Sequence, residues 1–305
     1  MEEKIKGFKI EKEMKVSELV NQMGLAGFQA SNVSQAVNLI KKMKKEKAVI
    51  FLSFTANMVT SGLREVFANL CKNKMIDVIV TSIGGVEEDL MKSFSSFLLG
   101  DFELDDKELH KQGLNRVGNI LIPNKSYEDL EDFLMPFFKK MLEIQKKENK
   151  LLSPSRIIFE LGKSIKDENS FLYWAAKNNI KVICPSPTDG AFGLQLFFFK
   201  QKFPEFGIDI TADMSEASDI VLNAEKTGAI ILGGGAAKHH TIGLNLLREG
   251  LDYAVYVTTA GEYDGSLSGA KPKEAKSWGK IKEESNVVSV VGDAVIIFPL
   301  IVSSL

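Results

Sequence analysis

The chain has 305 residues, 45% of them hydrophobic, which is enough to bury one large core or two modest ones. Its 40 acidic and 38 basic side chains nearly cancel, so no global field draws it to nucleic acid or to an anionic membrane. Two cysteines, Cys71 and Cys184, exclude a disulfide framework and a four-cysteine zinc site, and they fit a reducing compartment. The charged N-terminus argues against a signal peptide, and no apolar run approaches the roughly 20 residues of a membrane span. We expect a cytoplasmic protein that is not in a membrane and holds no metal.

Short apolar runs alternate with helical stretches along the chain. Residues 1–47 are expected to be mostly helical, interrupted near Phe28, and to pack as an extension on the main domain. Helices are also expected over 58–72 and from the triple glycine 233–235 to Arg248, and residues 100–124 are expected to form a loop-rich insertion or lid. The runs expected to form buried strands are residues 48–54, 76–81, 157–159, 181–184, 229–232, 253–259 and 287–291. This alternation is typical of βαβ units and predicts one α/β domain with a mostly parallel sheet.

Small and acidic residues follow several of the expected strands. They include Asn57, the stretch from Ser82 to Glu88, Asp189, the triple glycine and the stretch from Ala260 to Gly269. In open parallel sheets, ligands bind beyond the carboxyl ends of the strands. We therefore expect the chemistry of the protein at that edge of the sheet.

The triple glycine and the two histidines after it each allow two interpretations. Glycines between a strand and a helix let backbone amides approach a phosphate, but the pattern is not the dinucleotide fingerprint, and a tight turn explains it equally well. His239 and His240 are adjacent, so they face different sides of a helix and make a poor metal pair. A proton-shuttle role for one of them is modestly favoured over a structural role.

Glu87, Glu88 and Lys280 are ambiguous in the same way. The two glutamates can bind a cation or a ribose, but on their own they are better explained as exposed acids that interact favourably with a helix N-terminus. Lys280 follows Trp278 and Gly279 and precedes an apolar residue. Desolvation there would lower its pKa and favour the neutral amine that a nucleophile requires. A surface lysine that caps a turn explains the pattern about equally well.

These segments together resemble the deoxyhypusine synthase family, in the family's order and from about Lys6 to the C-terminus. The segments that carry the resemblance are Phe28-Gln29-Ala30, Asn57 with Ser61-Gly62 and Arg64-Glu65, Gly84 through Asp89, Asn115-Arg116 with Gly118-Asn119, Thr188-Asp189-Gly190, Gly233 through His240, Asp252 through Tyr256, Glu262 through Ser266 and Ser277 through Lys280.

The resemblance implies a single Rossmann-like domain over residues 1–305, with helices on both faces of the sheet, in a homotetramer whose active sites lie at a dimer interface. It also implies an NAD-dependent aminobutyl transfer. A hydride passes from spermidine to NAD, the resulting imine loses 1,3-diaminopropane, and the active-site lysine captures the four-carbon fragment as an imine. The fragment then passes to one lysine of the precursor of the hypusine-bearing translation factor, where the product imine is reduced by the retained hydride.

The resemblance also assigns roles to single residues. Lys280 matches the nucleophile, His239 the acid/base histidine and Trp278 the aromatic wall of the pocket. The amine-binding residues are expected to be these three together with Glu87, Gly265, Ser266 and Glu274. The residues expected to contact NAD are Asn57, Thr60, Ser82, Gly84, Glu88, Asp189, Gly234, Thr259, Ala260, Asp264, Asp293 and Ala294.

Three positions depart from the family pattern on the amine side. Leu194 and Leu267 stand where the family has aspartates, and Gly243 stands where it has an asparagine. Burying an ammonium group without a counter-charge costs several kcal/mol, so we expect weakened spermidine binding. Two alternatives stay open, namely a related enzyme of the homospermidine synthase type that uses another amine, and a non-catalytic NAD-binding paralogue. The N-terminus is shorter than in eukaryotic members, so no long segment is expected to plug the active site.

Overall fold

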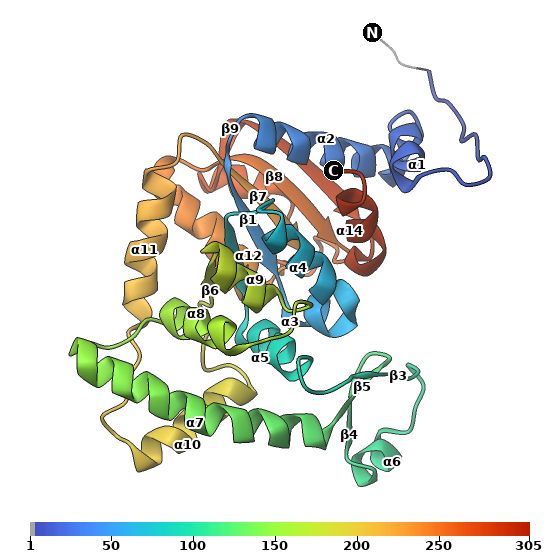
Figure 1. The fold of residues 1–305 in the computed structure, drawn as a ribbon. Coiled ribbons are helices and arrows are strands. Elements are labelled where there is room, and N and C mark those ends of the chain that lie inside the picture. Colours follow the sequence, from blue (N-terminus) through green and yellow to red (C-terminus); the bar gives the residue numbers. More distant parts are fainter. Residues whose placement is uncertain (1–3) are drawn as a thin grey trace. The chain divides into compact units, whose positions relative to one another are not determined.

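The computed structural model describes residues 4–305 (Figure 1). The chain forms two compact units, each with its own set of internal contacts. The first unit contains the chain up to Phe54, together with Met75–Val80 and Ala217–Leu305. The second unit contains Thr55–Lys74 and Thr81–Glu216. Each unit is therefore built from segments that lie far apart in the sequence.

A parallel sheet forms the centre of the first unit, where its strands lie in the order β2-β1-β7-β8-β9. Strand β1 pairs in parallel with β7, β7 with β8, and β8 with β9. Almost every residue of β1 and β7 is buried, as expected for a sheet covered on both faces. The strands are β1 (Val49–Phe54), β2 (Val78–Thr81), β7 (Thr227–Leu232), β8 (Leu251–Thr258) and β9 (Ile281–Val291). The predicted parallel sheet is confirmed.

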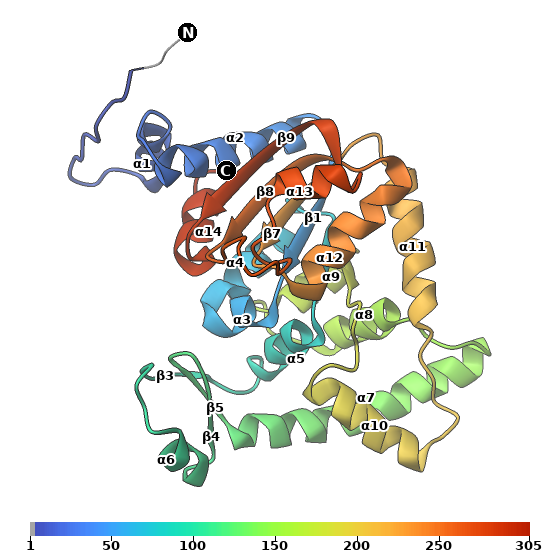
Figure 2. The same cartoon turned by 180° about the vertical axis from the view of Figure 1, so that it is seen from behind.

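Helices cover both faces of this sheet (Figures 1 and 2). On one face α2 and α14 pack against β8, and α2 also packs against β9. On the other face α12 packs against β1 and β7, and α13 packs against β9 (Figure 2). The helices of this unit are α1 (Val16–Met23), α2 (Gln29–Lys45), α12 (Gly235–Leu244), the 3-10 turn η2 (Asn245–Arg248), α13 (Pro272–Ser277) and α14 (Ala294–Val302).

The second unit is mainly helical. The long helix α7 packs against α5 and α10, while α9 packs against α4 and α8; α7 and α10 run side by side in both views (Figures 1 and 2). Its elements include α3 (Ala56–Met58), the π-helical turn η1 (Val59–Leu63), α4 (Arg64–Lys72), α5 (Ile83–Met91), α7 (Asn124–Glu148), α8 (Pro154–Ser164), α9 (Phe171–Asn178), β6 (Lys181–Ile183) and α10 (Ala191–Lys202). Helix α11 (Ile210–Leu222) begins in this unit and ends in the first.

Residues 98–123 form a small antiparallel sheet with one helix, so most of the stretch predicted to be loop-rich is regular structure. The strands lie in the order β3-β5-β4. Arg116 forms an ion pair of 2.6 Å with Asp106, and Gly118 adopts a φ of 63° between two strands, a conformation that glycine tolerates well. The elements are β3 (Leu98–Leu99), α6 (Asp106–Lys111), β4 (Leu114–Val117) and β5 (Ile120–Pro123).

The prediction that residues 1–47 are mostly helical and interrupted near Phe28 is confirmed for the described residues, because α1 and α2 lie on either side of that residue. Two other local predictions were wrong. The apolar run Ile157–Phe159 is not a strand but lies within α8, which starts with Ser153 as N-cap and Pro154 in its first turn. The helix expected over 58–72 is divided by η1, where Gly62 has a φ of 113°. Within residues 4–305, no helix is long and apolar enough to cross a membrane.

Candidate active site

The carboxyl ends of β7, β8 and β9 bring several predicted residues together at one edge of the sheet. The amide of Gly233 donates to the carbonyl of Val257 at 2.9 Å, and the amide of Gly292 donates to the carbonyl of Thr258 at 3.0 Å. The loops that follow the three strands therefore start side by side. They carry the predicted residues Gly234, Thr259, Ala260, Asp293 and Ala294. This is the arrangement that the parallel strand order predicts.

Each residue of the triple glycine has its own structural reason to be glycine. Gly233 and Gly235 have φ angles of 77° and 64°, which are strained for other residues. A Cβ on Gly234 would lie 2.4 Å from the Cα of Ser268. The close approach at Gly234 is thus to the loop after β8, and the tight-turn interpretation accounts for all three glycines. Helix α12 begins directly after this turn, at Gly235.

The loop after β8 is exposed around its tip and anchored at its end. The carboxylate of Asp264 accepts a hydrogen bond of 2.8 Å from the amide of Ser266, which lowers the pKa of Asp264. Gly265 adopts a φ of 72° in this turn. Lys271 and Glu262 close the loop with an ion pair of 2.7 Å. Asp264, Gly265 and Ser266 are all exposed.

A cavity of about 260 Å³ lies in the first unit, between α12, α13 and the end of the loop after β8. Four of the residues predicted to bind the amine line it, which are His239, Glu274, Trp278 and Lys280. Gly265 and Ser266 do not line it, and Glu87 belongs to the second unit. The remaining lining residues are Lys238, Ile242, Tyr256, Leu267, Ala270, Lys271 and Ala275.

Lys280 stands immediately before β9, at the opposite end of that strand from Asp293. Its backbone carbonyl accepts from the amide of Leu251 at 3.1 Å, which fixes the start of β9 beside the start of β8. The ammonium nitrogen lies 5.1 Å from the centre of the Trp278 ring, within the range of a cation–π contact. We expected the chemistry at the carboxyl ends of the strands. Lys280 instead precedes the first residue of β9, and its side chain lines the cavity beside α12 and α13.

Lys238 is a second lysine of this cavity, and its role was missed in the sequence. Its side chain is buried, and its Nζ donates hydrogen bonds of 2.7 Å to the carbonyls of Leu267 and Ala270. It also lies 4.3 Å from the centre of the Tyr256 ring. Burial lowers the pKa of Lys238 to about 8, an effect that nearby Glu274 opposes. The lysine thus ties the end of the loop to α12.

Tyr256 was also missed. It is 2% exposed, and its hydroxyl is buried without a hydrogen-bond partner among the described residues. Burial raises its pKa. Buried tyrosine hydroxyls usually have a hydrogen-bond partner. A tyrosine inside an apolar strand was therefore the feature of the sequence that could have marked this position as part of a site.

The two histidines face different surroundings, as predicted. His239 is exposed and lines the cavity. His240 does not line it, and its Nε2 is buried without a partner among residues 4–305. Burial lowers the pKa of His240, and His239 adds to the effect. Of the two, His239 is the one placed to exchange a proton with a molecule in the cavity.

Glu87 and Glu88 are buried in the second unit, so their interpretation as exposed helix acids was wrong. They lie on α5 and are 7% and 9% exposed. Glu87 accepts a hydrogen bond of 2.7 Å from the amide of Phe192, and Glu88 accepts one from the hydroxyl of Thr60. Burial raises the pKa of both carboxyl groups, that of Glu88 to about 7. Such paired buried carboxyl groups are typical of functional sites.

The buried carboxyl of Glu88 predicts a pH dependence of stability. Its folded pKa of about 7 lies above the ordinary value of 4.5, so the folded state binds the proton more tightly. The contribution of this carboxyl to the free energy of unfolding is therefore greatest below pH 4.5 and is lost as the pH rises to 7. Since each pH unit corresponds to about 1.4 kcal/mol, the loss reaches at most about 3 kcal/mol. Glu88→Gln is expected to flatten this trend in denaturant melts between pH 5 and pH 8.

Glu143→Gln, at an exposed position of α7, is the matched control and should leave the wild-type trend intact. An unchanged pH dependence in Glu88→Gln would show that this carboxyl does not titrate in the window.

The other predicted residues of the second unit lie at the starts of helices or beside them. Asn57 is exposed in α3, and Ser82 is the N-cap of α5. A Cβ on Gly84 would lie 2.8 Å from that of Ala56, so Gly84 permits close packing of α5 on α3. Asp189 is exposed just before α10.

The three departures from the family pattern occupy different places. Leu267 lines the cavity of the first unit, whereas Leu194 lies on α10 of the second unit and is 52% exposed. Gly243 lies on α12, and no atom within 4 Å would meet a Cβ there. Among the residues that line the cavity, Glu274 is the one carboxylate.

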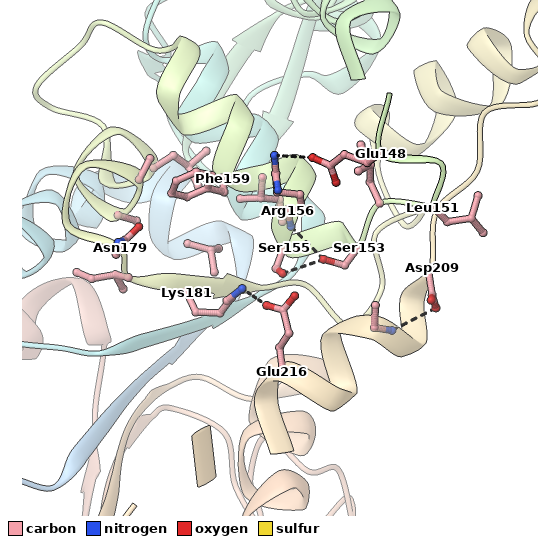
Figure 3. A pocket seen from close by; sticks show the side chains of 18 of the residues that line it. Glu148, Leu151, Ser153, Ser155, Arg156, Phe159, Asn179, Lys181, Asp209 and Glu216 are labelled. Carbon is pink, nitrogen blue, oxygen red and sulfur yellow. Dashed lines mark hydrogen bonds and ion pairs between the residues drawn. The ribbon is translucent and has the colours of Figure 1, made fainter. Parts of the chain in front are cut away.

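A second cavity, of about 520 Å³, contains none of the predicted residues (Figure 3). It lies between α8, α9, β6 and the start of α11. Four of its charged side chains pair with one another, Arg156 with Glu148 at 3.2 Å and Lys181 with Glu216 (Figure 3). The charged groups that Figure 3 draws are thus already partnered within the chain.

Comparison with known proteins gives one consistent result. The family model for deoxyhypusine synthase matches residues 18–305. A deoxyhypusine synthase of Senecio vernalis is 43% identical, over 98% of this chain and 88% of the relative, and one of Candida glabrata is 40% identical, over 96% and 86%. A solved structure from Entamoeba histolytica, of a protein assigned as a deoxyhypusine synthase, is 31% identical with a TM-score of 0.70, over 98% of this chain and 96% of that one.

Proposed function

The chain belongs to the deoxyhypusine synthase family of transferases, and we propose that it transfers a 4-aminobutyl group from spermidine to a protein lysine with NAD as cofactor. The observation that supports this best is the cavity of the first unit. It holds an amine side chain, Lys280, with an aromatic wall, an exposed histidine and one carboxylate. These are the groups that an imine-forming amine transfer requires.

The residues proposed to contact NAD fit its chemistry. Asn57, Thr60, Glu88, Asp189 and Asp293 offer amide, hydroxyl and carboxylate groups, which can hydrogen-bond ribose hydroxyls. The proposed contacts contain no lysine or arginine, but several lie at helix starts. Ser82 and Asp293 are the N-caps of α5 and α14, and Gly234 is that of α12. Backbone amides at such positions can bind a pyrophosphate. When bound, NAD would accept a hydride from the amine and later return it.

Lys280 is proposed to carry the four-carbon fragment. Its amine attacks the imine carbon of oxidised spermidine, a C–N bond to 1,3-diaminopropane breaks, and the fragment remains as an imine on Nζ. His239, on the same cavity, would pass the proton that the leaving amine needs. Trp278 would cover the fragment and limit attack by water, and Glu274 would pair with an ammonium group of the amine.

The remaining steps concern the acceptor and the assembly. An amine of the acceptor protein displaces Lys280 from the imine, and reduction of the product imine completes a transfer without net oxidation. We propose that the acceptor is a lysine of the precursor of the hypusine-bearing translation factor. We further propose a cytoplasmic homotetramer with active sites at a dimer interface.

The decisive experiment traps the intermediate. The protein is incubated with NAD and spermidine, borohydride is added, and the modified peptide is mapped by mass spectrometry. We expect a reduced four-carbon adduct on Lys280 that requires NAD. An adduct that forms only with another amine would replace spermidine as the donor, and no adduct with any amine would reject the transferase proposal. Homospermidine formation from a free diamine is assayed in parallel.

A further inference from the structure

The segment that carries Asn57 and Thr60 is not a regular helix. Between α3 and α4 the backbone forms the π-helical turn η1, and Gly62 leaves the helical conformation with a φ of 113°. A π-helical turn interrupts the regular pattern of backbone hydrogen bonds and is common at functional sites. Carbonyl groups at such an interruption need partners from elsewhere in the protein.

Lys92 supplies those partners. It follows the last residue of α5, and its Nζ donates hydrogen bonds of 2.7 Å to the carbonyl of Val59 and 2.8 Å to that of Thr60. The ammonium group also lies 5.1 Å from the centre of the Phe97 ring. Hydrogen bonds from a charged donor are stronger than those between neutral groups. One side chain therefore joins two successive carbonyls of the π-helical turn to the end of a neighbouring helix.

Helix α5 supports the same segment at two further levels. Near its start, Gly84 allows the backbone to approach Ala56, where an added Cβ would lie 2.8 Å from the Cβ of Ala56. In its middle, Glu88 accepts a hydrogen bond from the hydroxyl of Thr60. Lys92 provides the third level, beyond the C-terminal end. The three contacts follow one face of α5 and hold α3 and η1 along their length.

We propose that Lys92 is a positioning residue for the dinucleotide, because it holds the π-helical turn that places the side chains of Asn57 and Thr60. Lys92 itself acts through backbone carbonyls, not through contact with substrate. The inference rests on the proposed function, since it takes Asn57 and Thr60 to be NAD contacts.

The test compares Lys92→Met with wild type, and Lys92→Arg tests rescue by another cation. Methionine keeps the unbranched side chain up to the ε position but removes the donor, while Lys107→Met, at an exposed position of α6, is the control. Two quantities are measured, the NAD dissociation constant by calorimetry and the hydrogen exchange of peptides covering residues 56–63 in the protein without NAD. We expect the loss of two charged hydrogen bonds to weaken NAD binding about tenfold or more and to speed exchange in that segment.

The global melting temperature should fall only slightly, and Lys92→Arg should recover part of the affinity. Faster exchange with unchanged NAD affinity would overturn the positioning role, and unchanged exchange would overturn the support of the turn itself. Failure of the wild-type protein to bind NAD would instead reject the proposed function. The exchange measurement would still decide whether Lys92 holds the turn.

Discussion

Lys280→Ala is expected to abolish transfer and to remove the borohydride-trapped adduct. Without the amine at this position, no covalent intermediate can form on the enzyme, and loss of a nucleophile typically costs several orders of magnitude in rate. We expect a decrease in kcat of about a thousandfold or more. Lys280→Arg should be equally inactive, because a guanidinium stays protonated and cannot form the imine. The NAD dissociation constant, measured by calorimetry, should change little in either variant.

Lys273→Ala provides the matched control. Lys273 lies on α13 but does not line the cavity, so its loss should leave both the rate and the adduct unchanged. Persistence of a four-carbon adduct in Lys280→Ala, mapped to another lysine, would reject Lys280 as the carrier. Lys238 would then be the first candidate, because it lies on α12 and lines the same cavity as Lys280.

Restoring acids at Leu194 and Leu267 is expected to strengthen spermidine binding. An aspartate at position 267 would supply a counter-charge inside the cavity, and one at position 194 would restore the acid that the family pattern has on the amine side. A charged hydrogen bond contributes about 1.5–3 kcal/mol. The double variant Leu194→Asp/Leu267→Asp should therefore bind spermidine at least about tenfold more tightly than wild type. The comparison is made by calorimetry on the NAD complex. The dissociation constant of NAD should remain the same.

Leu222→Asp adds one charge at another exposed leucine, which is 59% exposed on α11, and controls for the effect of an acidic side chain added elsewhere on the surface. Should wild type already bind spermidine as tightly as the double variant, the leucines would not weaken the amine site. Tighter binding in Leu222→Asp as well would indicate a general charge effect.

The central strands could be predicted because their sequences fit only one kind of secondary structure. The runs that form β1, β7 and β8 are apolar, continuous and bounded by small residues, and such runs fit a sheet buried on both faces. Residues 157–159 were mispredicted for the opposite reason. Three apolar residues fit a short strand or the buried face of a helix, and only the Ser153-Pro154 start signal separates the two.

Residues of the candidate site could be predicted where the residue type and its sequence neighbours indicate a role. They could not be predicted where the role depends on tertiary contacts. Lys280, Trp278 and His239 do line one cavity. The burial of Glu88 could not be read from the sequence, because an acid in the first turns of a helix usually faces solvent. The contacts of Lys238 with two carbonyls depend on how the loop after β8 folds back, and no local pattern specifies that path.

Three lysines among residues 4–305 line the cavity, and the hydrogen bonds of Lys238 affect which of them can react. Burial lowers the pKa of Lys238 to about 8, so by acidity alone it would be a competent nucleophile near neutral pH. Its Nζ is instead held by the carbonyls of Leu267 and Ala270, and condensation with an electrophilic carbon would require both hydrogen bonds to break. Lys271 is held in an ion pair with Glu262. The contacts of Lys238 and Lys271 thus leave Lys280 as the lysine of the cavity that can react.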